Sequence, residues 1–175
     1  MKLWKKAAAV VLAAVMSLTL LTGCSGGGGG VGITADKTTE AKLVSAVQAY
    51  ADENSMSLSV NAQDTELGYK MLPSVISAWD SNAEGDYYKI FNESMAALNK
   101  KGTYYLVRFA AEGEPTPEYL SGLVKNLAPN IVKRVQRAGM TNPKEYGVAV
   151  TKSGGKTGED GKYRDNYYVV FVITE

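Results

Sequence analysis

The chain has 175 residues, 45% of them hydrophobic, and its 19 basic side chains nearly balance its 18 acidic ones. It has no histidine and one cysteine, which excludes Ser-His-Asp and Cys-His nucleophiles, imidazole bases, histidine metal sites and internal disulfides. A near-neutral chain also gives no electrostatic case for binding nucleic acid or acidic lipid. Any catalysis would have to depend on Asp, Glu, Lys or Tyr.

The first 23 residues have the pattern of an export signal. Lys2, Lys5 and Lys6 give a basic start, and the apolar residues 7–20 are too few for a comfortable membrane span. The Leu-Thr-Gly-Cys that ends at Cys24 resembles the lipobox of bacterial lipoproteins, which is cleaved just before its cysteine. We therefore expect a signal peptide at 1–23 and lipid attachment at Cys24. An ordinary signal peptide or a short membrane anchor is the alternative.

Residues 24–37 follow as a lipidated cysteine and a glycine-rich segment. Five consecutive glycines at 26–30 are typical of a flexible tether. Cleavage would remove three lysines and lower the formal charge from +1 to −2. Stable anchoring takes about two acyl chains, and a lipidated Cys24 would carry two or three. We therefore expect the protein to be anchored on the outer face of the bacterial cytoplasmic membrane. Residues 38–175 have the length of a single globular domain.

The domain is expected to begin with two helices. Thr38 or Thr39 can cap the first, whose apolar face repeats at helical spacing over 43–51. Asp64 can cap the second helix. Pro73 falls inside the pattern of this second helix and is expected to kink or restart it.

Further helices are predicted on both sides of the first strand. Asp86 can cap a third helix that stops at Gly102. Residues 116–118, Thr-Pro-Glu, are a strong helix start because they combine a cap, a proline at the first position and an early acid. Pro129 is expected to interrupt this helix, which ends at Gly139.

Three strands are predicted, at 103–110, 146–151 and 167–174, with a mobile hairpin loop at 153–161 between the last two. Both faces of the strands are apolar, whereas a sheet with one wet face would alternate apolar with polar residues. The expected fold is therefore mixed α/β (α+β). It is a three-layer α/β/α sandwich around a small, mainly antiparallel, three-stranded sheet with helices on both faces.

The order of these elements resembles the CAP superfamily (cysteine-rich secretory, antigen 5 and pathogenesis-related type 1), also called SCP-like. Residues 47–58 look like the first family helix, residues 116–127 look like the helix after the first strand, and residues 146–150 and 167–173 look like the closing hairpin. Typical members carry two histidines and two acids in a groove that can hold a divalent metal. This chain lacks histidine, so the resemblance implies a divergent member without the family site.

Two pairs of acids, Glu112 with Glu114 and Glu159 with Asp160, could in principle cleave glycosides. Acids in loops are more often simply solvated. Glu159, Asp160 and Asp165 could bind calcium weakly, but their spacing matches no known calcium loop, and no metal site or cofactor is predicted.

The chain has eleven tyrosines, which core and edge packing can explain. A groove lined by tyrosines is the alternative, because a tyrosine ring buries area while its hydroxyl stays wet. Tyr104, Arg108 and Glu112 share one strand face by parity and are the candidate ligand-binding residues.

The sequence therefore favours a non-enzymatic, surface-anchored binding or interaction module of the cell envelope. Its expected partners are the membrane, through the anchor, and a cell-wall glycan, a peptide or an envelope protein. A carboxylate-dependent hydrolase of the cell wall and a structural or assembly lipoprotein with a protein partner are the alternatives.

Overall fold

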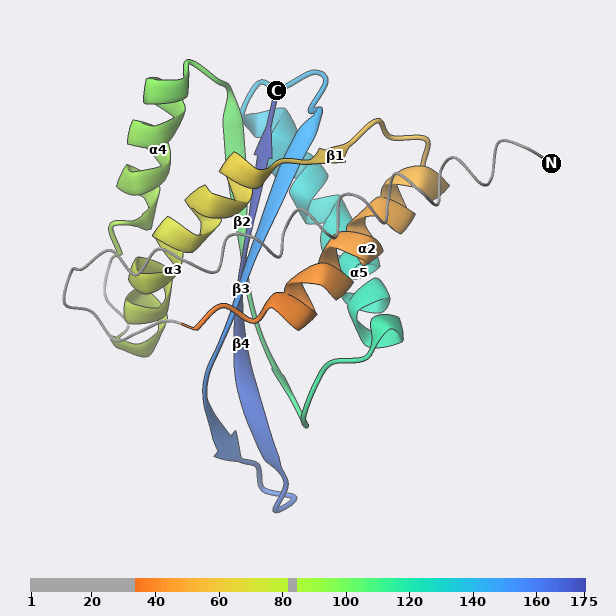
Figure 1. Cartoon of the computed structure of the whole chain (residues 1–175), viewed down its shortest axis with the longest axis vertical. Coiled ribbons are helices and arrows are strands. Elements are labelled where there is room, and N and C mark those ends of the chain that lie inside the picture. Colours follow the sequence, from red (N-terminus) through yellow and green to blue (C-terminus); the bar gives the residue numbers. More distant parts are fainter. Residues whose placement is uncertain (1–33, 82–84) are drawn as a thin grey trace. The chain divides into compact units, whose positions relative to one another are not determined.

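A computed structural model of the chain describes residues 34–81 and 85–175. The expected signal peptide, most of the tether and the predicted lipid site at Cys24 lie outside the described residues. Within the described part the chain forms four helices and four strands (Figure 1). In chain order these are α2 (Lys37–Glu53), β1 (Ser59–Val60), α3 (Ala62–Ser81), α4 (Tyr87–Leu98), β2 (Gly102–Ala111), α5 (Pro117–Arg137), β3 (Glu145–Thr157) and β4 (Tyr163–Thr174).

The strands form one sheet in the order β1-β3-β4-β2. The inner strand β4 is antiparallel to both neighbours, and Tyr168 lies opposite Thr151 of β3 and Arg108 of β2. The short β1 adds to the other edge of β3 in parallel, with Val60 opposite Tyr146. The mixed α/β class is confirmed, but the prediction of three strands is wrong. A strand of two residues is too short to show the alternation by which strands are recognised in a sequence.

Helices cover both faces of the sheet, so the described domain has three layers (Figure 1). Tyr167 and Tyr168 are each 1% exposed, and as neighbours in a strand they point into opposite cores. The core on the side of α2 and α5 contains Leu43, Leu120, Tyr146, Val148, Tyr167, Val169 and Phe171. The core on the side of α3 and α4 contains Leu67, Met71, Leu72, Val75, Phe91, Tyr168 and Val170.

Two glycines let α3 lie almost directly on the sheet. A Cβ atom at Gly147 of β3 would be 2.1 Å from the backbone nitrogen of Thr65, and one at Gly68 of α3 would be 2.8 Å from the Cβ of Ala149. Real Cβ atoms do not approach other atoms so closely, so larger side chains would push the helix away from the strand. These contacts fix the start of α3 against β3.

The first helix begins earlier than its sequence predicts. Asp36 is the N-cap of α2, because its Oδ1 accepts from the Thr39 backbone N–H at 3.0 Å and its Oδ2 accepts from the Thr39 hydroxyl at 3.1 Å. The prediction that Thr38 or Thr39 caps this helix is therefore wrong. Thr39 is instead buried as the residue that the cap binds.

The start of α3 also differs from prediction, because Asn61 takes the place expected for Asp64. The Asn61 side chain accepts from the Gln63 backbone N–H at 2.8 Å. Asp64 is inside the helix and 1% exposed, and its Oδ2 accepts from the Thr174 hydroxyl at 2.7 Å while its Oδ1 has no partner. Burial raises the pKa of the Asp64 carboxyl above its usual value.

Other predicted helix ends are partly confirmed. Thr116 caps α5 by accepting from the Tyr119 backbone N–H at 3.2 Å, as predicted. Asp86 is at the N-cap of α4, but its side chain makes no capping hydrogen bond. The helix ends at Asn99, which has the left-handed conformation with φ of 50°, and Gly102 already belongs to β2. The prediction that Gly102 stops this helix is therefore wrong by three residues.

Neither internal proline ends its helix. Pro73 lies within the continuous α3 and Pro129 within the continuous α5. Both prolines are solvent-exposed. The carbonyl group that each leaves without a helical N–H donor can turn toward water, so packing of the opposite face holds each helix together.

The predicted hairpin loop at 153–161 is mostly strand. β3 continues to Thr157, with a shift of register between Ser153 and Gly155, and pairs with β4 back to Tyr163. The Tyr163 hydroxyl accepts from the Gly155 backbone N–H at 2.9 Å. This two-stranded ribbon extends beyond the helices (Figure 1). Cross-strand pairing therefore overrides the turn-forming composition of this segment.

Candidate functional site

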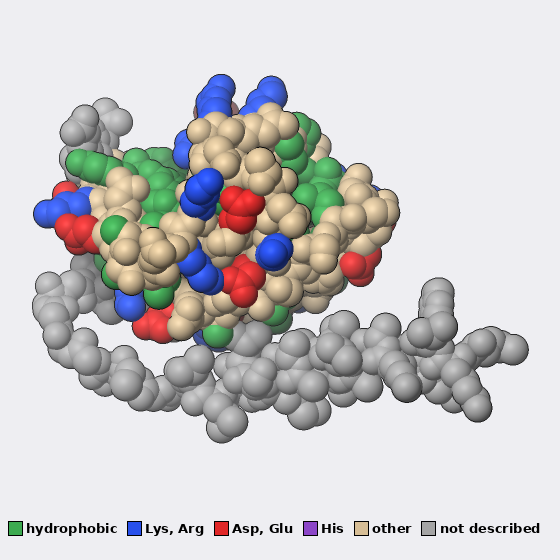
Figure 2. Space-filling view, turned by 90° about the horizontal axis from the view of Figure 1, so that it is seen from above, with side chains coloured by type: hydrophobic (Ala, Val, Ile, Leu, Met, Phe, Trp, Pro, Cys, Tyr) green, Lys and Arg blue, Asp and Glu red, His purple; other side chains and the backbone are tan. Residues whose placement is uncertain are grey.

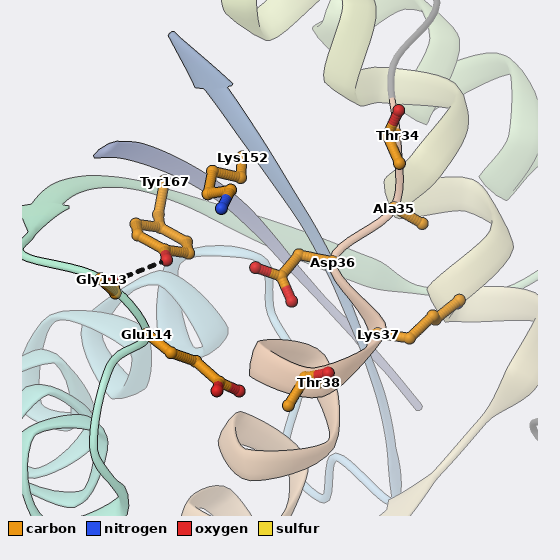
Figure 3. Close-up of a pocket in the computed structure, with 9 residues that line it drawn as sticks. All are labelled: Thr34, Ala35, Asp36, Lys37, Thr38, Gly113, Glu114, Lys152 and Tyr167. Atoms are coloured by element: carbon orange, nitrogen blue, oxygen red, sulfur yellow. Dashed lines mark hydrogen bonds between the residues drawn. The ribbon is translucent and has the colours of Figure 1, made fainter. Parts of the chain in front are cut away.

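A polar hollow of about 530 Å³ opens where the start of α2 meets the loop after β2 and the middle of β3 and β4 (Figure 3). Its volume is within the range of small-ligand sites. Two acids and two lysines contribute to the lining, so its charged side chains sum to zero. The lining residues are Thr34, Ala35, Asp36, Lys37, Thr38, Gly113, Glu114, Lys152 and Tyr167.

The side of the hollow formed by residues 34–36 is attached to the edge of β3. The Asp36 backbone N–H donates to the Val150 carbonyl at 2.9 Å, and the Thr151 hydroxyl donates to the Thr34 carbonyl at 2.8 Å. Ala35 forms an isolated antiparallel bridge with Thr151. Because the backbone of this segment is held on the sheet, the Asp36 side chain is placed at the mouth of the hollow (Figure 3).

Tyr167 of β4 forms part of the base of the hollow. Its ring stacks on Phe109 with 5.0 Å between centroids and an interplanar angle of 5°, and its hydroxyl donates to the Gly113 carbonyl at 2.9 Å (Figure 3). Burial, together with the negative charges of Asp36, Asp165 and Glu114, raises the pKa of Tyr167 to about 12. The hydroxyl therefore stays protonated at neutral pH and supplies hydrogen bonds, not charge.

Two of the charged groups at the rim, Glu114 and Lys152, are held by surface ion pairs. Glu114 is 2.9 Å from the Lys42 ammonium, and Lys152 is 3.4 Å from the Asp165 carboxylate. The side chains of Glu114 and Lys152 are 53% and 50% exposed. Exposed ion pairs contribute about 0–1 kcal/mol, so a charged ligand can replace either partner at low cost.

A buried polar cluster adjoins the hollow at Lys37. The Lys37 ammonium is 3.0 Å from a Glu40 carboxylate oxygen and 4.4 Å from the centroid of the Tyr69 ring. Glu40 is 3% exposed and accepts from the Tyr69 hydroxyl, which itself lies 3.4 Å from the Val150 backbone nitrogen. Burial and the nearby Glu40 carboxylate raise the pKa of Tyr69. This cluster joins α2, α3 and β3 behind the hollow.

Of the three predicted ligand-binding residues, Tyr104 and Arg108 lie in β2 and Glu112 lies just beyond it, and each has its own intramolecular partner. Tyr104 packs edge-on against Phe91 of α4 at 4.9 Å, and Arg108 lies over the Tyr168 ring at 5.3 Å. Glu112 follows the end of β2 and pairs with the hairpin residues Lys162 and Arg164, both at 3.2 Å. Among the described residues, no hydrogen bond or ion pair joins Tyr104, Arg108 and Glu112 to one another.

Three of the four acids considered for glycoside cleavage are in ion pairs. Glu112 and Asp160 share the Arg164 guanidinium, and Glu114 pairs with Lys42. The hydrogen bond from Arg164 lowers the pKa of Asp160. A general acid needs a raised pKa, so the environment of Asp160 is opposite to the one that a general acid for glycoside cleavage requires.

Residues 34–81 and 85–175 lack two other features. They contain no group of three or more acidic, histidine or cysteine residues that could hold a metal ion. None of their helices has both the length and the apolar composition needed to cross a membrane.

The hollow was not predicted from the sequence. Its residues come from four separate segments, 34–38, 113–114, 152 and 167, and a single lysine or acid in a loop does not indicate a site by itself. The Thr116 cap was the nearest indication, because it fixed where α5 begins and thus where the loop with Gly113 and Glu114 turns back toward β4.

Comparisons with protein families, with characterised proteins and with solved structures find no match for this chain. The resemblance to the CAP superfamily therefore stays a prediction from the sequence.

Proposed function

We propose that this protein is an envelope-anchored, non-enzymatic binding module, and that the polar hollow binds short peptides that carry both a free amino group and a free carboxylate. Peptides of the bacterial cell wall have this chemistry. The observation that carries the proposal is a hollow of small-ligand size whose lining contains both signs of charge.

The two ends of such a peptide find complementary charged groups in the lining of the hollow. Asp36 and Glu114 offer carboxylates to an ammonium group, and Lys152 offers an ammonium to a carboxylate (Figure 3). The backbone that lines the hollow can bind peptide amides. Because Asp36 and Lys152 are already held near one another by the attachment of residues 34–36 to β3, the site is largely preorganised.

The ion pairs and the burial of the acidic side chains favour binding over hydrolysis. Glu112, Glu114 and Asp160 each form an ion pair with a lysine or arginine at the surface. Asp64 has a raised pKa, but it is 1% exposed and bonded to Thr174 under the start of α3. A substrate at the surface does not reach it.

Calorimetry with trialanine tests the site directly. The N-acetyl and C-amide forms of the peptide each lack one charge, and we expect both to bind more weakly than the free peptide. Lys152→Gln should abolish the preference for a free carboxylate, and Asp36→Asn, which keeps the helix cap, should weaken the preference for a free amine. Lys156→Gln, which removes a lysine of the hairpin outside the hollow, is the matched control.

Equal binding of the three peptides, or no binding of any, would contradict the proposal. Incubation with insoluble peptidoglycan separates the alternatives. Retention on the wall without soluble products supports a binding module. Release of fragments that is lost in Glu112→Gln or Glu114→Gln would identify a hydrolase, and co-purification of an envelope protein in place of wall binding would favour an assembly role.

A further inference from the structure

Cations gather at the end of the domain that is opposite the hairpin. This basic end comprises Lys101 before β2, Lys144 before β3, and Lys133, Arg134 and Arg137 in the last turns of α5. All five residues are solvent-exposed. They come from three segments of the chain, so their gathering is a property of the fold.

Hydrogen bonds to the end of β4 hold these segments together. The Glu175 backbone N–H donates to the Lys101 carbonyl at 3.0 Å, and the Lys144 backbone N–H donates to the Thr174 carbonyl at 3.1 Å. The turn after α5 is joined to the same place, because the Thr141 hydroxyl donates to the Glu175 carboxylate at 3.1 Å. Lys101, Lys144 and the end of α5 therefore surround one strand end.

The basic end carries an excess of positive charge. Among residues 34–81 and 85–175, none of its five cations is in an ion pair, and the pair at this end, Lys100 with Glu145, is neutral. The remaining acid, Glu175, is bonded to Thr141 and to the Asn142 backbone. Figure 2, which looks onto this end, shows lysine and arginine side chains beside acidic ones near the middle of the view, with further acidic side chains toward its edges.

Of these cations, Arg134 already has intramolecular partners, because it donates to the Tyr104 carbonyl at 3.4 Å and lies over the Tyr104 and Tyr105 rings. Lys101, Lys133 and Lys144 make no side-chain hydrogen bond in the described part of the chain, and like charges at close range destabilise a folded domain. A negatively charged partner would remove the repulsion. The overall charge of −2 expected after cleavage conceals this local excess, which explains why composition gave no case for an acidic partner.

We propose that the basic end docks on the anionic phospholipid headgroups of the membrane that carries the anchor, an inference that depends on the proposed lipid attachment. Thr34 is attached at Thr151, six residues along β3 from Glu145, so the basic end is about 20 Å from where the described chain begins. The ten steps from Cys24 to Thr34 can span up to about 35 Å. The chain is thus long enough for this end to rest on the bilayer.

Such docking would give the tethered domain a defined orientation. The basic end would face the lipid, while the hairpin would point toward the wall. The polar hollow, which lies beside the attachment of residues 34–36, would stay accessible at the side of the domain. Each cation near an anionic bilayer contributes about 1 kcal/mol, or roughly fivefold in the population of the docked state.

The test uses the mature, lipid-anchored chain in nanodiscs of phosphatidylcholine, alone or mixed equally with phosphatidylglycerol. A donor dye is attached at Asn142→Cys, beside the basic end, and acceptor dyes are placed on lipid headgroups. The acylated Cys24 has no free thiol, so the introduced cysteine is labelled alone. We expect more energy transfer on the anionic discs than on the neutral ones, and loss of the difference at high salt. A dye at Thr157→Cys, in the hairpin, should show no such increase.

Charge variants give the matched comparison. Combining Lys101→Gln, Arg137→Gln and Lys144→Gln should lower the ratio of docked to free protein roughly 100-fold on anionic discs. The control combination Lys70→Gln, Lys89→Gln and Lys156→Gln removes the same charge elsewhere and should have little effect. All variants are first checked for an unchanged thermal midpoint.

Equal transfer on the two kinds of disc, or an equal effect of the two triple variants, would overturn the inference. So would a response to soluble polyglycerol phosphate with none to the anionic bilayer, which would assign the basic end to an anionic polymer. A chain that does not stay in the discs would refute the anchor, and the docking inference with it. Peptide binding in the hollow is measured separately and would be unaffected by any of these results.

Discussion

The hydroxyl of Tyr69 holds the buried cluster behind the hollow, and its removal should be costly. In the folded protein the Glu40 carboxylate is 3% exposed and accepts from this hydroxyl and from Lys37. Tyr69→Phe leaves that carboxylate with Lys37 alone and removes the acceptor near the Val150 backbone nitrogen. A hydrogen bond to a charged group contributes about 1.5–3 kcal/mol net, so we expect a loss of about 2 kcal/mol.

Equilibrium unfolding in urea measures this loss as a midpoint lowered by about 1 M, because the slope for a domain of this size is about 2 kcal/mol/M. Tyr50→Phe is the matched control, since the Tyr50 hydroxyl makes no hydrogen bond among the described residues. A double-mutant cycle with Glu40→Gln should show coupling of at least about 1 kcal/mol. If Tyr69→Phe costs no more than Tyr50→Phe, or if the cycle shows no coupling, the cluster does not stabilise the fold as argued.

Two further substitutions test the packing and charge around the start of α3. Gly147→Ala should destabilise the domain by roughly 2–3 kcal/mol in urea, because the new methyl group would meet the α3 backbone, whereas Gly122→Ala on the open face of α5 should gain about 0.5 kcal/mol. Equal effects would show that α3 can move away freely. For Asp64, the raised pKa means that the folded state binds the proton more tightly, so its contribution to stability is complete below the unfolded pKa and is lost as pH rises through the folded one. Asp64→Asn should therefore gain stability relative to the wild type between about pH 4 and pH 7, and unfolding curves whose difference is flat over that range would contradict this.

The sequence predicted those parts of the fold that local patterns specify. The strand 103–110 and the cap at Thr116 were confirmed, because a continuous apolar run and a Thr-Pro-Glu start act within a few residues. The strand at 167–174 was confirmed within a longer β4. Its two apolar faces also predicted helices on both sides of the sheet, which the two cores confirm.

The features that the sequence did not predict depend on contacts between residues that are far apart in the sequence. β1 exists because it pairs with Glu145 and Tyr146, and β3 continues through a glycine-rich segment because β4 lies beside it. The helix with Pro73 stays continuous because its other face is packed on the sheet. The polar hollow also depends on such contacts. Nothing in the sequence links Asp36, Glu114 and Lys152, and only the fold brings their segments together.

Under the proposed N-terminal anchor, the attachment of residues 34–36 to β3 has a mechanical consequence. Tension applied ahead of Thr34 is first carried by the two hydrogen bonds to Val150 and Thr151, and only then by the cap at Asp36. The hydrogen bonds of this short attachment can break one at a time. Separating the central strands would require many hydrogen bonds to break together. Pulling would therefore free this short segment, and open the side of the hollow that it forms, well before the rest of the domain unfolds.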